Sequence, residues 1–286
     1  MSHRVRTRRS VVFRARLVVL AVGLLALATF SGCSRDPDPF LAGAGDVGSD
    51  GASSAAGESV DGADLARTLS DGFSSAEGAG APPFTVVAQA TVDRVIARDR
   101  PDPGGEVLAD LLHPTAVGGP LVFRVVDGSA DGDGEWIEVH LPVQPNGTTG
   151  WIRRADVTLS NNPYRIEIDR ARFALTVYRQ NEVWLETTIA VGTGETPTPV
   201  GDFYLMELLA PPDPAGAYGP YAFGLSGFSE VLDSFGGADT AIIGLHGTND
   251  PGSLGTNVSH GCIRLENTVI ERLASSVPLG TPVVIT

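Results

Sequence analysis

Short β-rich runs separated by turns dominate the sequence beyond residue 83, and this pattern limits the folds available to the chain. Glu135–Leu141 alternates polar and apolar residues with a period of two, which is typical of a half-buried strand. Turn-rich stretches such as Asp99–Gly105 separate these runs, and Arg179–Glu182 predicts a hairpin. Strands and helices do not alternate along the chain, so a doubly wound parallel sheet is not expected. We therefore expect a mainly β fold.

A single stretch near the C-terminus, Asn267–Ser276, has the spacing of a helix. Val269, Ile270 and Leu273 would share one face of it, and Asn267 is expected to cap its first turn. Pro282–Ile285 then reads as a closing strand. The sequence thus predicts one helix set among strands.

Residues 1–33 have the pattern of an export signal. Six arginines and no acidic residue precede an apolar run of 14 residues, Leu17–Phe30. This run is shorter than the about 20 residues that a membrane-spanning helix needs, and it suits a signal peptide. Phe30-Ser31-Gly32-Cys33 resembles a bacterial lipobox, which implies a lipoprotein held to the membrane by a lipid on Cys33, with the rest of the chain outside the cytoplasm, in the cell envelope. The alternative is an uncleaved signal anchor.

Residues 34–83 consist largely of Gly, Ala, Ser and Asp. Such a composition buries too little apolar surface to offset the entropy of ordering, so we expect a disordered, flexible tether. The whole chain has a formal net charge of −14, and the part after Cys33 carries −20 once the six N-terminal arginines are set aside. This charge argues against a nucleic-acid partner, because no basic face is available to neutralise phosphates.

Residues 84–160 contain several short strand-like runs with Gly-rich turns, which favours a small β-barrel. The segment Gly150–Val157, which reads GWIRRADV, resembles the last strand of bacterial SH3-like domains. Such domains often bind wall peptides, and the equal alternative is a spacer that packs on the next domain. Asn161-Asn162-Pro163 marks the boundary, and the next strand is expected at Tyr164–Asp169.

Two segments near the C-terminus carry the chemistry. They read IIGLHGTNDP and SLGTNVSHGCIRL, and they contain His246, His260 and Cys262. A thiol with a nearby imidazole is the minimum equipment for nucleophilic acyl transfer, since the thiolate is the attacking species. We expect Cys262 to be the nucleophile and His246 the general base, while Gly261 lets the backbone approach a substrate.

These two segments closely resemble the L,D-transpeptidase family with its YkuD-type catalytic domain, which cross-links bacterial peptidoglycan. The resemblance covers about residues 163–286 and implies a β-sandwich-like fold of mixed sheets with one helix beside the active site. It assigns the nucleophile to Cys262, the base to His246, oxyanion donors to the backbone of His260, Gly261 and Cys262, and supporting roles to Ser259 and Arg264. We expect the guanidinium of Arg264 to orient the site or to bind a substrate carboxylate.

Two further segments look like parts of the same family's substrate groove. Gly192–Tyr204 is similar to the family's TPTPxGxF segment, in which prolines preset a rigid turn before a strand. Ala217–Leu225 is expected to line the donor site, with Tyr221 as the single contact expected. The alternative is that the Tyr221 ring is part of the core.

The implied reaction needs no cofactor. Cys262 would attack the third residue of a donor tetrapeptide stem, release the terminal D-Ala and pass the acyl group to an acceptor amine, which gives a 3→3 cross-link. Attack by water would make the enzyme an L,D-carboxypeptidase, and the same site could attach proteins to the wall. A non-catalytic wall-binding lipoprotein is the remaining alternative. A zinc site at His246, Asp250, His260 and Cys262 is disfavoured, because the spacing fits no familiar zinc module.

Overall fold

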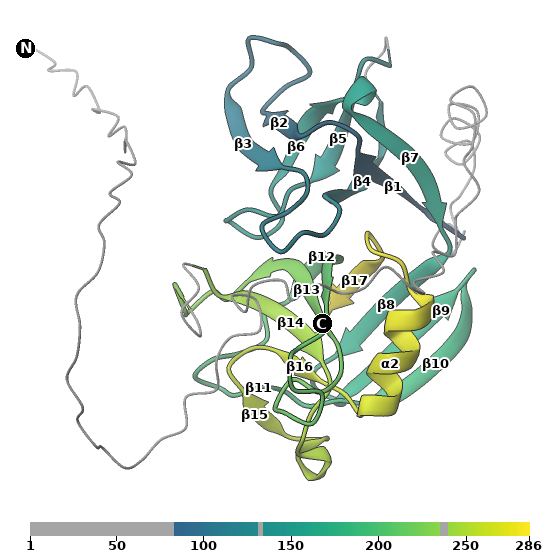
Figure 1. Cartoon of the computed structure of the whole chain (residues 1–286), viewed down its shortest axis with the longest axis vertical. Coiled ribbons are helices and arrows are strands. Elements are labelled where there is room, and N and C mark those ends of the chain that lie inside the picture. Colours follow the sequence, from purple (N-terminus) through teal and green to yellow (C-terminus); the bar gives the residue numbers. More distant parts are fainter. Residues whose placement is uncertain (1–82, 131–133, 235–239) are drawn as a thin grey trace, which may run out of the picture. The chain divides into compact units, whose positions relative to one another are not determined.

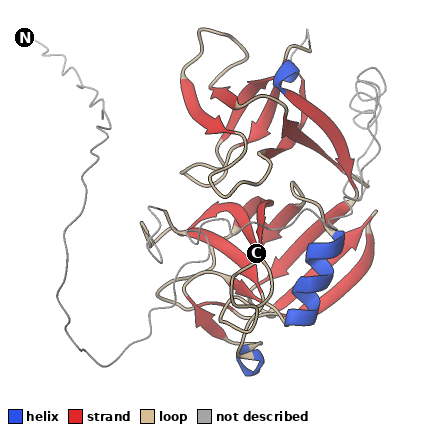
Figure 2. Cartoon of the chain, viewed as in Figure 1, coloured by secondary structure: helices blue, strands red, loops and turns tan. Residues whose placement is uncertain are grey.

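The computed structural model describes residues 83–130, 134–234 and 240–286 (Figure 1). The predicted export signal, Cys33 and tether lie outside these residues. Within the described part, no helix has the length and apolar character needed to cross a membrane. Strands make up most of the regular secondary structure in this part, and one α-helix accompanies them (Figure 2), so the expected mainly β fold is confirmed.

The first sheet has seven strands in the order β3-β2-β6-β5-β4-β1-β7. Its core includes Ile137, Val139 and Leu141, which are the apolar members of the alternating run noted in the sequence. The elements are β1 (Thr85–Ala90), β2 (Arg94–Arg98), β3 (Val107–Leu112), β4 (Val122–Ala130), β5 (Trp136–His140), β6 (Thr149–Arg153), the short 3₁₀ helix η1 (Arg154–Asp156) and β7 (Val157–Asn162). Whether this region is an SH3-like domain stays a prediction.

The second sheet has eight strands in the order β10-β9-β8-β17-β12-β13-β14-β16, and a two-stranded parallel sheet pairs β11 with β15. The larger sheet is mixed, because β17 with β8 and β14 with β16 are parallel pairs among antiparallel ones. Its strands are β8 (Tyr164–Asp169), β9 (Ala174–Arg179), β10 (Glu182–Thr188), β12 (Gly201–Leu209), β13 (Ala222–Phe228), β14 (Ile242–His246), β16 (Ile263–Arg264) and β17 (Pro282–Ile285). The small sheet consists of β11 (Val191–Gly192) and β15 (Asn257–Ser259), and a 3₁₀ helix, η2 (Pro251–Ser253), precedes β15.

The predicted hairpin joins β9 to β10 by a two-residue turn. Gln180 and Asn181 have φ angles of 51° and 68°. Positive φ at both central positions matches the right-handed twist of the flanking strands, which is why such turns close hairpins.

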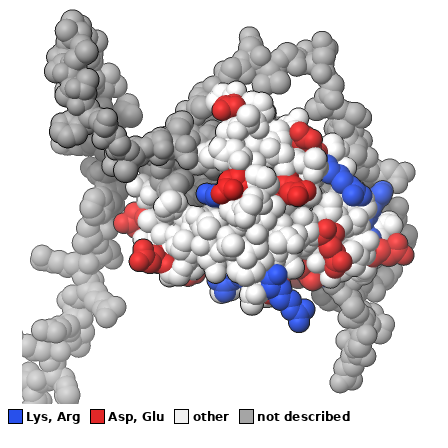
Figure 3. Space-filling view, turned by 90° about the horizontal axis from the view of Figure 1, so that it is seen from below, with Lys and Arg blue, Asp and Glu red and all other residues white. Residues whose placement is uncertain are grey.

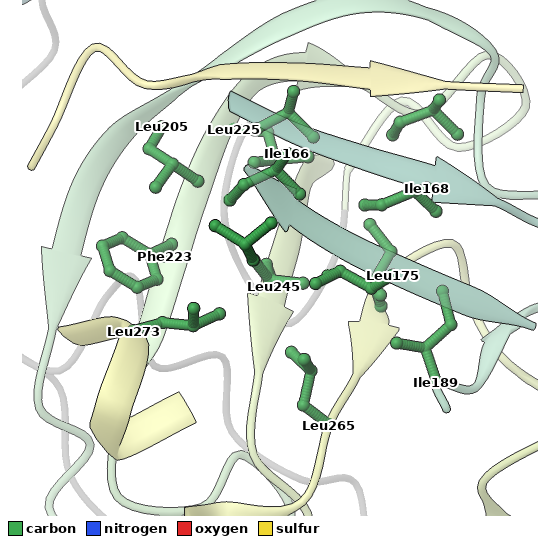
Figure 4. Close-up of a cluster of buried hydrophobic side chains, with 14 of the residues drawn as sticks. Ile166, Ile168, Leu175, Ile189, Leu205, Phe223, Leu225, Leu245, Leu265 and Leu273 are labelled. Carbon is green, nitrogen blue, oxygen red and sulfur yellow. The ribbon is translucent and has the colours of Figure 1, made fainter. Parts of the chain in front are cut away.

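Helix α2 (Asn267–Ser276) covers the core of the second sheet. Ile270 and Leu273 are fully buried, and Figure 4 shows Leu273 in the same apolar cluster as Phe223 and Leu245. The predicted capping role of Asn267 is wrong. Glu266 occupies the cap position without a side-chain cap bond, and the Asn267 side chain instead accepts a hydrogen bond from the loop after β14.

Both acidic and basic side chains appear on the face drawn in Figure 3. Mixed charge of this kind gives no single strong field on that face.

Candidate active site

Neighbouring parallel strands bring the predicted histidine and cysteine segments together. β14 ends at His246 and pairs with β16, so that Leu245 lies opposite Ile263 and His246 opposite Arg264. The loop His260-Gly261-Cys262 connects β15 to β16 and leads directly into this pair (Figure 1). The register thus places residues 18 apart in sequence side by side, and Cys262 directly precedes the paired residues of β16.

Gly244 on β14 lies close to both the thiol and the imidazole. Its N–H donates to Sγ of Cys262 at 3.3 Å. A Cβ built on Gly244 would lie 3.4 Å from that sulfur and 3.5 Å from Cδ2 of His246. Cys262 as a residue is partly exposed. Because a backbone N–H directed at sulfur favours the charged form, Gly244 stabilises the thiolate. The sequence analysis did not identify this glycine.

His246 is 4% exposed, and its Nδ1 lies 2.6 Å from the carbonyl oxygen of Gly247. A carbonyl only accepts hydrogen bonds, so Nδ1 carries the ring proton and Nε2 is left as the acceptor. Burial lowers the pKa of His246 to about 4, with the nearby positive charge of Arg264 adding to this effect and the Gly247 bond opposing it. The ring is therefore neutral at pH 7, as a general base must be. The hydrogen-bond partner that orients the His246 ring is therefore a backbone carbonyl.

The ring of Tyr218 lies against the imidazole. The two ring centroids are 4.7 Å apart, with planes inclined at 55°. Tyr221, the expected donor-site contact, is partly buried and packs against the main core, and its carbonyl accepts from the N–H of Gly247. Core packing was the alternative for this ring, and a contact of Tyr221 with substrate stays a prediction.

The loop that follows His246 packs closely at Gly247 against Gly219 and Asn267. Oδ1 of Asn267 accepts from the N–H of Thr248 at 2.8 Å. A Cβ at either glycine would overlap with Oδ1 of Asn267, and Gly219 also has a φ of 66°. The start of α2 thus holds the carbonyl that orients His246. Nothing in the sequence pattern pointed to this role, because it depends on three segments that meet only in the fold.

The side chain of Ser259 makes two hydrogen bonds to the backbone of the loop that contains Cys262. Its Oγ accepts from the N–H of Gly261 at 3.1 Å and donates to the carbonyl of Cys262 at 2.5 Å. Gly261 has a φ of 121°, which only glycine adopts without strain. The Gly261 amide was expected to be an oxyanion donor, and in this structure it donates to Ser259.

The threonine-proline segment lies under the same loop. Oγ1 of Thr196 donates to the carbonyl of Ser259 at 3.2 Å, and Oγ1 of Thr198 donates to the carbonyl of Gly261 at 2.7 Å. The N–H of Gly192 in turn donates to the Thr198 hydroxyl at 2.9 Å. This segment, expected to be part of the substrate groove, therefore braces the backbone of the cysteine loop.

Arg264 and His260 flank the thiol in sequence and differ in exposure. Arg264 is partly buried, its backbone pairs with Ala190, and its Nε is buried without a hydrogen-bond partner. His260 is exposed. Among the described residues, no group of three or more His, Cys, Asp or Glu side chains is placed to hold a metal ion.

Comparisons with known proteins point to one family. The family model of the L,D-transpeptidase catalytic domain (YkuD) matches residues 163–285. The chain is 32% identical over 141 residues to the putative L,D-transpeptidase YqjB of Bacillus subtilis, covering 45% of this chain and 73% of that protein. It is 38% identical over 123 residues to the putative L,D-transpeptidase YkuD of the same organism, covering 43% of this chain and 66% of that protein.

Among solved structures, a cysteine-to-serine mutant of the Enterococcus faecium L,D-transpeptidase is 25% identical, with a TM-score of 0.33, and the match covers 43% of this chain and 49% of that one. The chain spans just under two thirds of the length of YkuD and about half of the Enterococcus protein. Its sequence similarity to YqjB and YkuD shows that the chain belongs to the L,D-transpeptidase family.

Proposed function

We propose that this protein is a cysteine L,D-transpeptidase that forms 3→3 cross-links between peptidoglycan stem peptides through a thioester on Cys262. The observation that carries the proposal is that the sulfur of the partly exposed Cys262 and the buried, neutral imidazole of His246 both lie next to Gly244. A neutral ring with Nδ1 bound to the Gly247 carbonyl leaves Nε2 as the base for the thiol proton.

In the first half-reaction, Sγ of Cys262 attacks the carbonyl carbon of the third residue of the donor stem, and Nε2 of His246 takes the thiol proton. The C–N bond to the terminal D-Ala then breaks, and the imidazolium returns its proton to the leaving nitrogen. Since burial disfavours the charged ring, the imidazolium is a strong acid, which makes this proton transfer favourable.

In the second half-reaction, the side-chain amine of an acceptor stem attacks the thioester carbonyl. His246 takes the proton of the amine, the C–S bond breaks, and the thiolate recovers its proton. If water replaces the amine, the product is a tripeptide, and the enzyme acts as a carboxypeptidase. Each half-reaction passes through an oxyanion, for which the backbone amides of His260 and Cys262 are the expected donors, because the Gly261 amide donates to Ser259.

Arg264 is the proposed contact for a carboxylate of the substrate. Its buried Nε has no partner in the described structure, and a buried guanidinium nitrogen without a partner is costly. A substrate carboxylate would satisfy it and would be held close to the thiol. His260, which is exposed beside the nucleophile, is the proposed wall of the substrate entrance.

The test is incubation with a disaccharide-tetrapeptide followed by mass spectrometry. Transpeptidation gives a dimer that has lost one D-Ala, whereas hydrolysis gives the tripeptide alone. Unchanged substrate would contradict both activities and favour a non-catalytic wall-binding protein. If the enzyme instead attaches proteins to the wall, mass spectrometry would detect a stem peptide covalently joined to an amine of the acceptor protein.

We also propose that the enzyme works outside the cytoplasm as a lipoprotein, with residues 84–160 as an SH3-like domain. The support is the resemblance of Phe30–Cys33 to a lipobox and of Gly150–Val157 to an SH3-like strand. Cys33→Ala should release the protein from membranes, as measured by fractionation and immunoblot. A variant that stays in the membrane fraction would favour an uncleaved signal anchor.

A further inference from the structure

The side chain of Thr198 forms a hydrogen bond with the backbone of the loop that carries Cys262. The side chain is 1% exposed, and its hydroxyl donates to the carbonyl of Gly261 at 2.7 Å. The same oxygen accepts from the N–H of Gly192 at 2.9 Å, which fixes the direction of the hydroxyl proton. A hydroxyl has one proton to donate, so the Gly192 bond commits that proton to Gly261.

The backbone around this hydroxyl leaves it little freedom. A Cβ at Gly192 would overlap with the carbonyl of Thr196 and lie 2.5 Å from the nitrogen of Thr198, so only glycine permits the approach. Thr198 stands between Pro197 and Pro199, and a residue before proline is restricted to extended conformations. The oxygen is therefore held at a fixed position below the cysteine loop.

The direction of the Gly261 carbonyl sets the direction of the N–H of Cys262. The peptide group that joins the two residues is planar and trans, so its C=O and its N–H point in opposite directions. Since the carbonyl is directed down to Thr198, the N–H of Cys262 is directed to the other side of the loop. Ser259 constrains the neighbouring peptides, but its hydroxyl bonds the Gly261 amide and the Cys262 carbonyl, not this peptide group.

We propose that Thr198 is a positioning residue that directs the N–H of Cys262 toward the oxyanion formed when the thiol is acylated. The inference rests on the proposed acyl transfer and adds to it the residue that orients one oxyanion donor. Without the hydroxyl, the Gly261–Cys262 peptide loses the bond that sets its rotation. The thiol accepts a hydrogen bond from the N–H of Gly244 on β14 and makes none with Thr198.

The experiment compares two reactions at the same sulfur. Acylation by a carbapenem opens the lactam C–N bond through an oxyanion, and the lactam nitrogen takes up the proton. Alkylation by iodoacetamide displaces iodide without any oxyanion. Thr198→Val should slow acylation roughly 10- to 100-fold, as expected for a misdirected donor, and leave alkylation within about twofold. Thr198→Ser, which keeps the hydroxyl, should restore acylation to within about threefold of the wild-type rate.

Thr281 provides a matched control. It is 0% exposed, and its hydroxyl donates to the carbonyl of Pro278 at 2.7 Å, so Thr281→Val removes an equivalent buried bond elsewhere. This control should leave the ratio of acylation to alkylation unchanged. If Thr198→Val does not fold, Thr198→Ala removes the same hydroxyl and should lower the same ratio.

Equal loss of both rates in Thr198→Val, or no loss in either, would overturn the positioning role. Failure of Thr198→Ser to restore acylation would do the same. If the wild-type protein is alkylated but neither acylated by carbapenem nor able to process tetrapeptide, the proposed function itself is overturned, and this inference with it.

Discussion

Nδ1 of His246 lies 2.6 Å from the carbonyl oxygen of the next residue, Gly247. A chain cannot easily place a carbonyl so close to the preceding ring, and here the junction of Gly219, Gly247 and Asn267 holds it there. The bond selects the tautomer in which Nε2 is unprotonated, so the backbone supplies what a carboxylate supplies in other cysteine and serine enzymes.

Cys262→Ala should abolish turnover of tetrapeptide and covalent capture of a carbapenem, because no other group in the described site can form the thioester. Intact-protein mass spectrometry detects the adduct. Circular dichroism should show an unchanged fold, since the thiol is only partly buried. An adduct that still forms on the variant would exclude Cys262 as the nucleophile.

His246 should make the protein less stable in acid. Burial lowers its pKa from 6.5 to about 4, so between these pH values the unfolded chain binds a proton that the folded protein does not. The free energy of unfolding therefore decreases as the pH falls from about 6.5 to 4, by about 3 kcal/mol in total. Urea titrations across this range measure the slope.

The matched variant for that measurement is His246→Gln, which cannot titrate. Its unfolding free energy should fall less steeply over the same pH range, because the contribution of the imidazole is gone. Parallel slopes for wild type and variant would contradict the assigned pKa direction. Turnover of the wild type should also fall as the pH drops toward 4, since a protonated ring cannot accept the thiol proton.

Gly261→Ala should damage both stability and acylation. The residue has a φ of 121°, and a Cβ there would lie 3.0 Å from Cδ1 of Ile243. Strain of this kind costs about 1–3 kcal/mol, which urea denaturation would measure, and the displaced loop should slow carbapenem acylation. Gly194→Ala is the control, because no φ strain applies to Gly194 and no atom lies within 4 Å of the added carbon. Equal effects of the two substitutions would refute this account.

Asn267→Ala should lower the acylation rate about tenfold while costing only about 1 kcal/mol of stability. The variant loses the acceptor for Thr248, so the Gly247 carbonyl is less well held and His246 less well oriented. Thr268→Ala, an exposed change in the first turn of the same helix, should alter neither quantity. A wild-type acylation rate in Asn267→Ala would show that this junction does not position the base.

The predictions that came closest to the structure depend on local periodicity and turn chemistry. Tyr164–Asp169 and Pro282–Ile285 are strands with the predicted limits, and Arg179–Glu182 closes the predicted hairpin. Asn267–Ser276 is a helix because three apolar residues recur on one face. The expected cap at Asn267 failed because a tertiary hydrogen bond to Thr248 takes the place of a local one.

The sequence by itself determined the family resemblance and the mainly β fold, and it predicted the candidate thiol and imidazole, because these features depend on short contiguous motifs and local patterns. Only the tertiary structure decided what surrounds them: the amide of Gly244 on the sulfur, the ring of Tyr218 on His246 and the hydroxyl of Thr198 under the cysteine loop. These contacts join segments that are far apart in the sequence and that the sheet register and close packing at glycines bring together. The spacing of residues within one segment does not predict where another segment lies in space.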